Sequence, residues 1–494
     1  MNDIKEQISY REKEWDFYKK YTNPYEYIHS IVPMKKKSVS KYKPISRSYF
    51  KMLEMMATFE LDQPAIQSIR TFHLAEGPGG FIEAICNKRN NMSDEYYGMT
   101  IIIDEMDDNV PAWNKTGYFL SQNPNVNIEY GIDGTGNLLH INNFENCVHK
   151  YGSSMDLITA DGGFDFSNDF NRQEISITNL LWGQVCYALC LQKQGGNFVL
   201  KIFDVFYEHT VHILYILAAF YEEVHICKLK TSRVGNSEKY VVCKKFRFTS
   251  YLEFYQVIHE SFEHMCLLDV SSVIRNPILH PFSFKDECAT NCESSMRNDV
   301  TCDFSQIWLN RSNSSSTSAR TPKRGTSVGG RGLTAQAVED SSSQVNVSYP
   351  NSRQFCTRIK SDIIQDKQWK PNNQYETDTD NKPPVVHIWR LLSCHIPRFF
   401  TKQVEEINAI FGQQQIENIH YTISLIDKNP KQDKLDQLVK QNITKCMKWC
   451  VEHAVTYNNF MNTNIFEAGG VCGNNLSFSK STKSQGSLLF LHNS

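Results

Sequence analysis

The chain has 494 residues, too many for one ordinary domain, so its length predicts two domains and a linker. A hydrophobic fraction of 40% supports a substantial core, while a formal charge of −2 confines any nucleic-acid-binding surface to a local patch. The N-terminus opens no apolar run of the signal-peptide kind, and no window approaches the roughly 20 apolar residues that span a bilayer. We therefore expect a cytoplasmic or nuclear protein without membrane contact.

The 15 cysteines show no regular spacing, which argues against a disulfide framework and favours reduced thiols. Cys288, Cys292 and Cys302 lie near His280, but their spacing is poor for a zinc site and no second pair follows. The sequence therefore predicts no metal site.

The first 70 residues have a mainly helical pattern and form a predicted N-terminal arm. Within it, the stretch Met34–Lys51 interleaves lysines and an arginine with Tyr42, Tyr49 and Phe50. Basic residues alternating with aromatic ones suit phosphate contact and base stacking. A solvated basic loop explains this stretch equally well.

Residues 71–248 alternate short apolar runs with helical segments, which predicts a doubly wound α/β domain with a mostly parallel sheet. The predicted strands are Phe72–Glu76, Tyr97–Ile103, Asn125–Tyr130, Met155–Ala160, Asn197–Phe203, Val224–Leu229 and Tyr240–Lys244. The predicted helices are Gly80–Asn90, Arg172–Lys193 and Glu208–Tyr221. Only Lys230–Lys239 separates the last two strands, too little for a helical crossover, so the last strand should be antiparallel.

The rest of the chain divides by composition. We expect a helical extension over 249–310, a disordered linker over 311–384, a small, mainly helical C-terminal module over 385–466 and a flexible tail over 467–494.

A glycine-rich turn, Glu76-Gly77-Pro78-Gly79-Gly80-Phe81, follows the first predicted strand and opens a helix. Glycines allow close approach of the backbone to a ligand, and the helix N-terminus offers amide donors. The turn departs from the dinucleotide pattern G-x-G-x-x-G and is closer to a loop that binds S-adenosylmethionine. Glu76 is compatible with the positive charge of that ligand. Asp104 is the nearest candidate for a ribose contact at the second strand, and its role stays open.

Two charged residues mark the carboxyl ends of later strands, where open α/β sheets bind ligands. Asp161 follows the fourth strand and precedes two glycines, so it either caps a turn or serves the site. Lys201 interrupts the apolar fifth strand. Either its ammonium group extends to the strand end, or its neutral form is stabilised so that it can act as a base.

Four collinear segments resemble one family, the cap-specific mRNA 2′-O-ribose methyltransferases, which are the eukaryotic and viral branch of the FtsJ/RrmJ-like enzymes. The segments are Glu76–Phe81, Tyr130–Gly136, Ala160–Phe164 and Thr231–Val242, and the similarity runs from about Ser46 to Phe246. The resemblance implies a Rossmann-like S-adenosylmethionine-dependent methyltransferase fold with a seven-stranded, mostly parallel sheet and an antiparallel last strand.

The resemblance also implies the site residues. Its catalytic tetrad falls on Lys51, Asp161, Lys201 and Glu238, with Lys201 as the proton acceptor. Its methyl-donor contacts fall on Ser46, Glu76, Gly77, Pro78, Gly79, Gly80, Phe81, Ile132, Asp133 and Asp161. Its RNA contacts fall on Asn171, Arg172, Gln173 and Asn236.

The implied function is 2′-O-methylation of the first or second transcribed nucleotide of capped mRNA, with S-adenosylmethionine as cofactor. The partners would be the capped 5′ end of mRNA and other capping or transcription components. One alternative is the same chemistry on ribosomal or transfer RNA, and another is a non-catalytic RNA-binding subunit of a capping complex. The intact tetrad argues against the second alternative. Pro78 and the missing dinucleotide pattern argue against a nicotinamide oxidoreductase.

Overall fold

The computed structural model describes residues 2–63, 65–102, 112–163, 173–267, 344–347 and 396–460. The chain divides into a compact unit, Met1–Asn458, and a second unit, Asn459–Ser494. All elements named below lie in the first unit. The candidate zinc residues and Asp104 lie outside the described residues.

The centre of the first unit is a mixed sheet with the strand order β3-β2-β1-β4-β5-β7-β6-β8. The strands are β1 Arg70–Leu74, β2 Glu95–Met99, β3 Val126–Ile128, β4 Met155–Ala160, β5 Gln192–Ile202, β6 Tyr221–Cys227, β7 Lys239–Phe246 and β8 Gln344–Val347. The pairs from β3 to β5 are parallel, whereas β7 lies antiparallel between β5 and β6. The predicted α/β fold, with seven strands and an antiparallel last strand, is confirmed.

The sequence did not predict β8, which pairs antiparallel with β6. This strand falls inside the predicted linker, where Val345 and Val347 alternate with polar residues over only four positions. So short a period-two pattern is weak against a Ser- and Gly-rich background. The rest of 311–384 lies outside the described residues.

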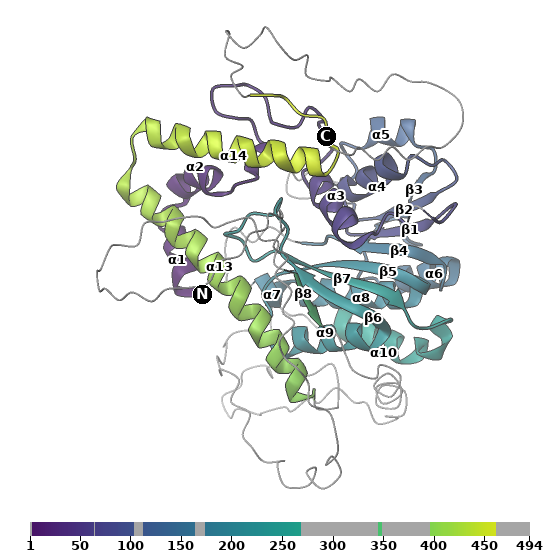
Figure 1. Ribbon diagram of the computed structural model, residues 1–494. Helices are drawn as coiled ribbons and strands as arrows, with labels where there is room; N and C mark the ends of the chain where they lie inside the picture. The colour runs from purple at the N-terminus through teal and green to yellow at the C-terminus, as the bar shows by residue number, and fades with distance from the viewer. Residues whose placement is uncertain are drawn as a thin grey trace, which may run out of the picture. The chain divides into compact units, whose positions relative to one another are not determined.

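Helices cover both faces of the sheet (Figure 1). They are α1 Asn2–Ser9, α2 Glu12–Thr22, η1 Glu26–Ile28, α3 Ser48–Phe59, α4 Gly80–Arg89, α5 Gly117–Gln122, α6 Ile141–Tyr151, α7 Gln173–Ser176, α8 Thr178–Leu191, α9 Glu208–Phe220, η2 Tyr251–Glu253, α10 Tyr255–Leu267, α13 Arg398–Lys428 and α14 Gln432–Glu452. Helices α6, α8, α9 and α10 share one hydrophobic cluster on one face, while α3 packs against α4. None of the described helices has a stretch long and apolar enough to cross a bilayer.

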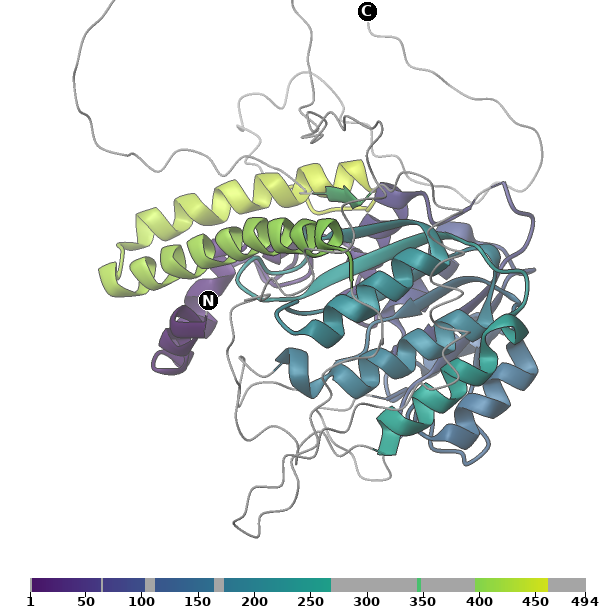
Figure 2. The same ribbon diagram turned by 90° about the horizontal axis from the view of Figure 1, so that it is seen from below.

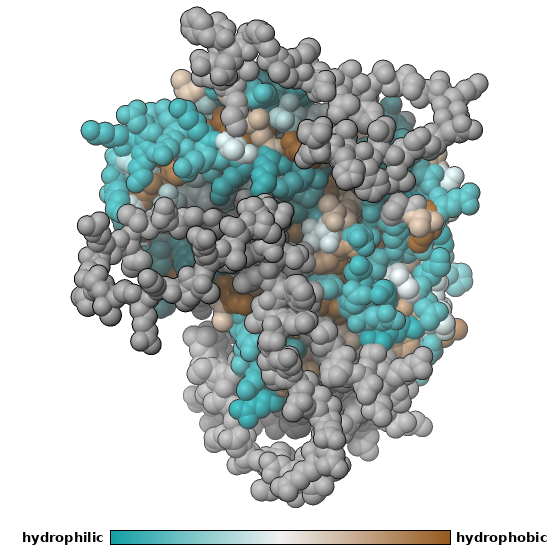
Figure 3. Space-filling view, in the orientation of Figure 1, coloured by the Kyte–Doolittle hydropathy of each residue, from teal (hydrophilic) through white to brown (hydrophobic). Residues whose placement is uncertain are grey.

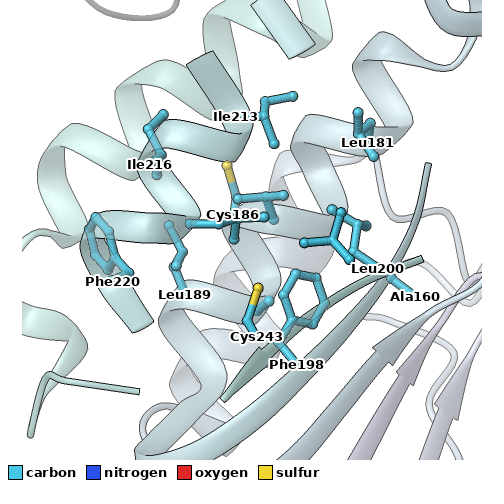
Figure 4. Packing of buried hydrophobic residues seen from close by; sticks show 14 of the residues in the cluster. Ala160, Leu181, Cys186, Leu189, Phe198, Leu200, Ile213, Ile216, Phe220 and Cys243 are labelled. Atoms are coloured by element: carbon cyan, nitrogen blue, oxygen red, sulfur yellow. The ribbon is translucent and has the colours of Figure 1, made fainter. Parts of the chain in front are cut away.

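The main core lies between the sheet and helices α8 and α9 (Figure 4). Almost every side chain of α8 and all but one of α9 are buried, as expected for helices that are apolar all round. In the close-up, Cys186 and Leu189 of α8 lie between Ile216 of α9 and the β5 residues Phe198 and Leu200. A full burial of each large apolar side chain contributes roughly 1.5–3 kcal/mol, so this layer fixes β4 and β5 in place.

The last two helices pack against the N-terminal arm and the core. Helix α13 contacts α1, α2 and α9, and α14 contacts α2 and η1. Figures 1 and 2 show the two helices joined at one end and diverging from there. The outer side of α14 is hydrophilic, with Lys434, Lys440 and Lys448 exposed (Figure 3, upper left). The sequence placed these helices in a module of their own, whereas in the structure they lie in the same compact unit as the sheet.

Candidate active site

The glycine-rich turn lies at the carboxyl end of β1, between that strand and α4. Gly79 has a φ of +103°, a backbone conformation that residues with a side chain rarely adopt. A Cβ atom on Gly80 would overlap the hydroxyl groups of Ser46 and Ser48, which hydrogen-bond to each other. The turn and Ser46, both predicted to contact the methyl donor, are therefore neighbours.

Glu76 places a buried carboxylate inside this turn. Burial raises its pKa well above the usual value, and the charge of Asp161 raises it further. Oε1 accepts a hydrogen bond of 2.5 Å from the amide of Phe81, but Oε2 is buried and has no hydrogen-bond partner among the described residues. Because an unpartnered buried oxygen is costly, it indicates a place for a ligand that donates hydrogen bonds or carries positive charge.

Ile132 and Asp133 form the second segment predicted to contact the methyl donor. Thr100 connects this segment to the glycine-rich turn. A Cβ on Gly136 would overlap the carbonyl of Thr100, and the methyl group of Thr100 would lie 3.0 Å from a Cβ on Gly77. Ile132 is 68% exposed. The carboxylate of Asp133 accepts hydrogen bonds from Thr135 and Asn143 and pairs with His140. Burial alone would raise the pKa of Asp133, but these bonds hold it well below its usual range. The contact of Asp133 with the methyl donor stays a prediction.

The four residues of the predicted tetrad come together at the same edge of the sheet. Lys51, on α3, pairs with Glu238, which immediately precedes β7, at 2.8 Å. Asp161, which follows β4, lies 3.4 Å from Lys201 of β5, and Lys201 also donates a bond of 2.6 Å to the backbone carbonyl of Asp161. All four side chains are largely buried, with exposed fractions between 8% and 15%. Four distant parts of the chain thus form two lysine–carboxylate pairs.

Tyr240 joins these two pairs. Its hydroxyl donates a bond of 2.7 Å to Asp161 and accepts one of 3.3 Å from Lys51. In the antiparallel pairing of β5 and β7, Tyr240 lies directly opposite Lys201. Tyr240 was not among the predicted site residues, although its position two residues after Glu238 in an extended segment places it on the same face.

Glu238 carries a stable negative charge. Burial alone would raise its pKa, but Lys51, Lys201 and Lys228 hold it well below the usual range. Lys228, also missed, donates hydrogen bonds to the backbone carbonyls of Glu238 and Asn236, at 2.7 Å and 2.6 Å. Ser232 donates to Glu238 Oε1 at 2.8 Å. The loop between β6 and β7 therefore orients this carboxylate from several sides.

The structure describes only two of the four residues predicted to contact RNA. Asn171 and Arg172 lie outside the described residues, and Gln173 is buried at the start of α7. Asn236 is exposed, and its side-chain oxygen accepts a hydrogen bond from Lys228.

A further cationic group, which the sequence analysis did not assign, lies beside the tetrad. Arg47 precedes Lys51 by one helical turn and donates to the carbonyl of Thr231 at 3.4 Å. Burial lowers its pKa, and the neighbouring charge of Arg233 lowers it further. Arg233 forms a two-pronged pair with Glu26, whereas Arg47 makes no ion pair within the described part of the chain. Among the residues that the structure describes, no carboxylate pairs with the guanidinium of Arg47.

No group of three or more His, Cys, Asp or Glu side chains in the described ranges is arranged to hold a metal ion. The cysteines whose side chains the structure describes, Cys86, Cys147, Cys186, Cys190, Cys227, Cys243, Cys446 and Cys450, are buried free thiols. Burial raises the pKa of Cys190, Cys227 and Cys243.

Comparison with known proteins finds similarity to one family, whose model matches less than half of the chain. Residues 44–246 match the model of the FtsJ-like methyltransferases. The cap-specific mRNA (nucleoside-2'-O-)-methyltransferase 2 of Danio rerio is 30% identical over 271 residues, which are 50% of this chain and 34% of that protein. The protein of the same name from Drosophila melanogaster is 28% identical over 267 residues, 50% of this chain and 36% of its own length. A cap-specific mRNA (nucleoside-2'-O-)-methyltransferase 1 of Trypanosoma brucei brucei is 42% identical over 119 residues, 24% of this chain and 32% of that protein. This chain thus spans about a third of the length of these relatives.

Proposed function

We propose that this protein is an S-adenosylmethionine-dependent RNA 2′-O-methyltransferase that acts on the first or second transcribed nucleotide of capped mRNA, because residues 44–246 match the FtsJ-like methyltransferase model. The observation that carries the proposal is the convergence of Lys51, Asp161, Lys201 and Glu238 beside the glycine-rich turn. The names of the relatives support the capped substrate.

The residues at the turn fit the cofactor. The positive φ of Gly79 and the close approach of the Ser46 and Ser48 hydroxyls to Gly80 both require glycine, so they fix the course of the turn. The unpartnered Oε2 of Glu76 suits a cationic ligand. When bound, S-adenosylmethionine supplies a methyl group activated by its sulfonium. Glu76, the turn and Ser46 would hold it.

The tetrad would prepare the ribose. Lys201 accepts the proton of the 2′-hydroxyl at Nζ, and Asp161 fixes that amine through its carboxylate and its backbone carbonyl. A Cβ on Gly163 would lie 3.0 Å from Nζ of Lys201, so the glycine leaves this side of the amine open to a substrate. Lys51, held by Glu238, orients the same hydroxyl. Methyl transfer requires the 2′-oxygen to be held in line with the methyl group, with the acceptor of its proton already in place.

The surroundings of the tetrad suit an RNA backbone. Arg47 lacks an ion pair in the described structure, and a guanidinium binds phosphate in a planar, two-pronged geometry. The N-terminal arm also carries three exposed lysines, Lys35, Lys36 and Lys37, whose charge suits contact with RNA phosphates. We assign Arg47 to a phosphate next to the target ribose.

The test is methyl transfer from labelled S-adenosylmethionine to capped and uncapped RNAs, with the label mapped by nuclease digestion. We expect label on the ribose of the first or second nucleotide of capped RNA. Lys201→Met should abolish transfer and keep cofactor binding, whereas Lys193→Met, an exposed lysine of the same strand, should change neither. Label on a base would contradict the reaction. Label on uncapped structured RNA alone would favour a ribosomal or transfer RNA substrate, and RNA binding without transfer would favour a non-catalytic subunit.

A further inference from the structure

A second buried ionic cluster lies behind the tetrad, formed by Lys5, Asp204, Ser237 and Lys239. Lys5 of α1 pairs with Asp204 at 2.7 Å and donates to the hydroxyl of Ser237 at 2.8 Å. Ser237 in turn donates to Asp204 at 2.9 Å, and Lys239 lies 3.6 Å from the same carboxylate. The side chains of Lys5, Asp204 and Lys239 are only 5–9% exposed. None of these groups has a part in the proposed chemistry.

The position of the cluster relates it to the site. Asp204 comes three residues after Lys201, and Ser237 and Lys239 flank Glu238. Lys239 also donates to the backbone carbonyls of Phe203 and Ser237, at 2.9 Å and 3.0 Å. The cluster therefore holds the chain that follows β5, three residues after Lys201, against the chain that precedes β7 and carries Glu238.

The cluster takes its members from distant segments. Ile4 and Ile8 of α1 pack against Ile419 and Ile423 of α13, and Lys5 lies between those two isoleucines in the sequence. Gln415 of α13 donates to the carbonyl of Gly235 at 3.2 Å and lies 3.4 Å from the hydroxyl of Ser237. Docking of α1 on α13 thus delivers an amine to the loop that bears Glu238.

The charges explain why the amine matters. Burial alone would raise the pKa of Asp204, but Lys239 and Lys5 lower it. A buried carboxylate is stable only when its charges and lone pairs are matched by partners. Without Lys5, Asp204 and Ser237 each lose a hydrogen-bond donor, and one of the restraints on the backbone next to Glu238 is removed.

We propose that Lys5 is a positioning residue, which sets the Glu238 loop through Asp204 and Ser237 and so couples the docking of helix α1 to methyl transfer. The effect on turnover rests on the proposed function, whereas the effect on the loop does not. A displacement of about 1 Å at a reacting centre can lower a rate roughly 100-fold, so loss of this amine should act on kcat.

The test compares Lys5→Met with Lys13→Met, an exposed lysine of the neighbouring helix, in the full chain. We expect Lys5→Met to lower kcat about 10-fold or more and to leave the affinity for S-adenosylmethionine within about two-fold. Hydrogen exchange of residues 228–238 should be faster in Lys5→Met and unchanged in Lys13→Met. This second readout needs no activity, so it separates failure of this inference from failure of the proposed reaction.

A mutant cycle separates positioning from general stability. If Lys5 acts through Glu238, the effect of Lys5→Met on kcat should shrink to about two-fold or less in a Glu238→Gln background. The same fold loss in both backgrounds, or a kcat within two-fold of the parent together with unchanged exchange, would overturn the proposal. Should Lys5→Met fail to fold, Ser237→Ala carries the test, because it keeps the Lys5–Asp204 pair and removes the hydroxyl that links it to the loop. It should still lower kcat and speed exchange of 228–238, and the absence of both effects would overturn the proposal.

Discussion

The hydroxyl of Tyr240 donates a hydrogen bond of 2.7 Å to the carboxylate of Asp161. The same hydroxyl accepts a bond from Lys51, so one tyrosine connects the two lysine–carboxylate pairs of the site. Burial raises the pKa of Tyr240 well above its usual value, and the charges of Asp161 and Glu238 raise it further. The phenol therefore stays protonated and remains a hydrogen-bond donor.

Replacing Tyr240 with phenylalanine should separate the two pairs without opening the core. A hydrogen bond to a charged partner contributes about 1.5–3 kcal/mol, and about 1.4 kcal/mol of lost transition-state stabilisation is a ten-fold loss of rate. We expect Tyr240→Phe to lower kcat about 10-fold with little change in cofactor affinity, as measured by steady-state kinetics and calorimetry. Tyr221→Phe is the matched control, since its buried hydroxyl bonds at 3.1 Å to Gln192, a neutral partner. It should cost stability and leave kcat within two-fold; equal kinetic losses in both variants would contradict the bridging role.

Gly80 and Gly117 each begin a helix, which makes them a pair for testing the glycine-rich turn. A Cβ on Gly80 would overlap the hydroxyls of Ser46 and Ser48, while a Cβ on Gly117 would meet nothing within 4 Å. We expect Gly80→Ala to weaken S-adenosylmethionine binding about 10-fold or more, because the turn must move away from Ser46. Gly117→Ala should bind as the parent does. Calorimetric titration decides, and an unchanged affinity in Gly80→Ala would remove the turn from the cofactor site.

Most of the fold could be predicted because strand and helix periods are local signals. From β1 to β6, short apolar runs that form strands alternate with helical segments, and this pattern is clear in the sequence. The connection before β7 is too short for a helical crossover. The packing of α13 against α1 could not be predicted, since it depends on contacts of Ile4 and Ile8 with Ile419, which follows about 400 residues later in the chain. Amphipathic periods show that a helix has a partner without identifying it.

Some residues of the site could likewise be predicted from the sequence, and others could not. Lys201 stood out because a charge interrupts an apolar strand, and the tetrad could be assigned through a family resemblance. Tyr240 and Lys228 did not stand out, since a tyrosine inside one strand and a lysine just after another are ordinary in sequence. The role of Tyr240 follows from strand register, which places it opposite Lys201 once β7 is paired with β5. The role of Lys228 follows from its bonds to the backbone carbonyls of Asn236 and Glu238.

The pair of Glu26 and Arg233 makes a prediction about acid stability. Burial alone would raise the pKa of Glu26, but its hydrogen bonds and ion pair with Arg233 lower it from 4.5 to about 2. A lowered folded-state pKa stabilises the protein above the unfolded value, and this contribution disappears as pH falls from about 4.5 to about 2. Glu26→Gln should therefore lower the free energy of unfolding by about 3 kcal/mol at pH 7 and by less than half of that at pH 3. Urea unfolding at both pH values tests this. Glu12→Gln, at an exposed position, should change neither value; a deficit in Glu26→Gln that does not depend on pH would contradict the ionic origin.

Arg47 and Arg70 provide the test of the RNA-facing surface. Arg47 lies one helical turn from Lys51 without an ion pair in the described structure, whereas Arg70 begins β1 at the opposite edge of the sheet and pairs with Glu95. If Arg47 binds a phosphate, Arg47→Gln should raise KM for capped RNA about 10-fold and leave cofactor affinity unchanged. Each neutralised phosphate contributes about 0.9 to the slope of log affinity against log salt for duplex DNA and about 0.7 for a single strand, so the slope should fall by roughly one unit. Arg70→Gln should alter neither quantity. Binding measured across a salt series decides, because a purely structural loss at Arg47 would weaken binding without reducing the slope.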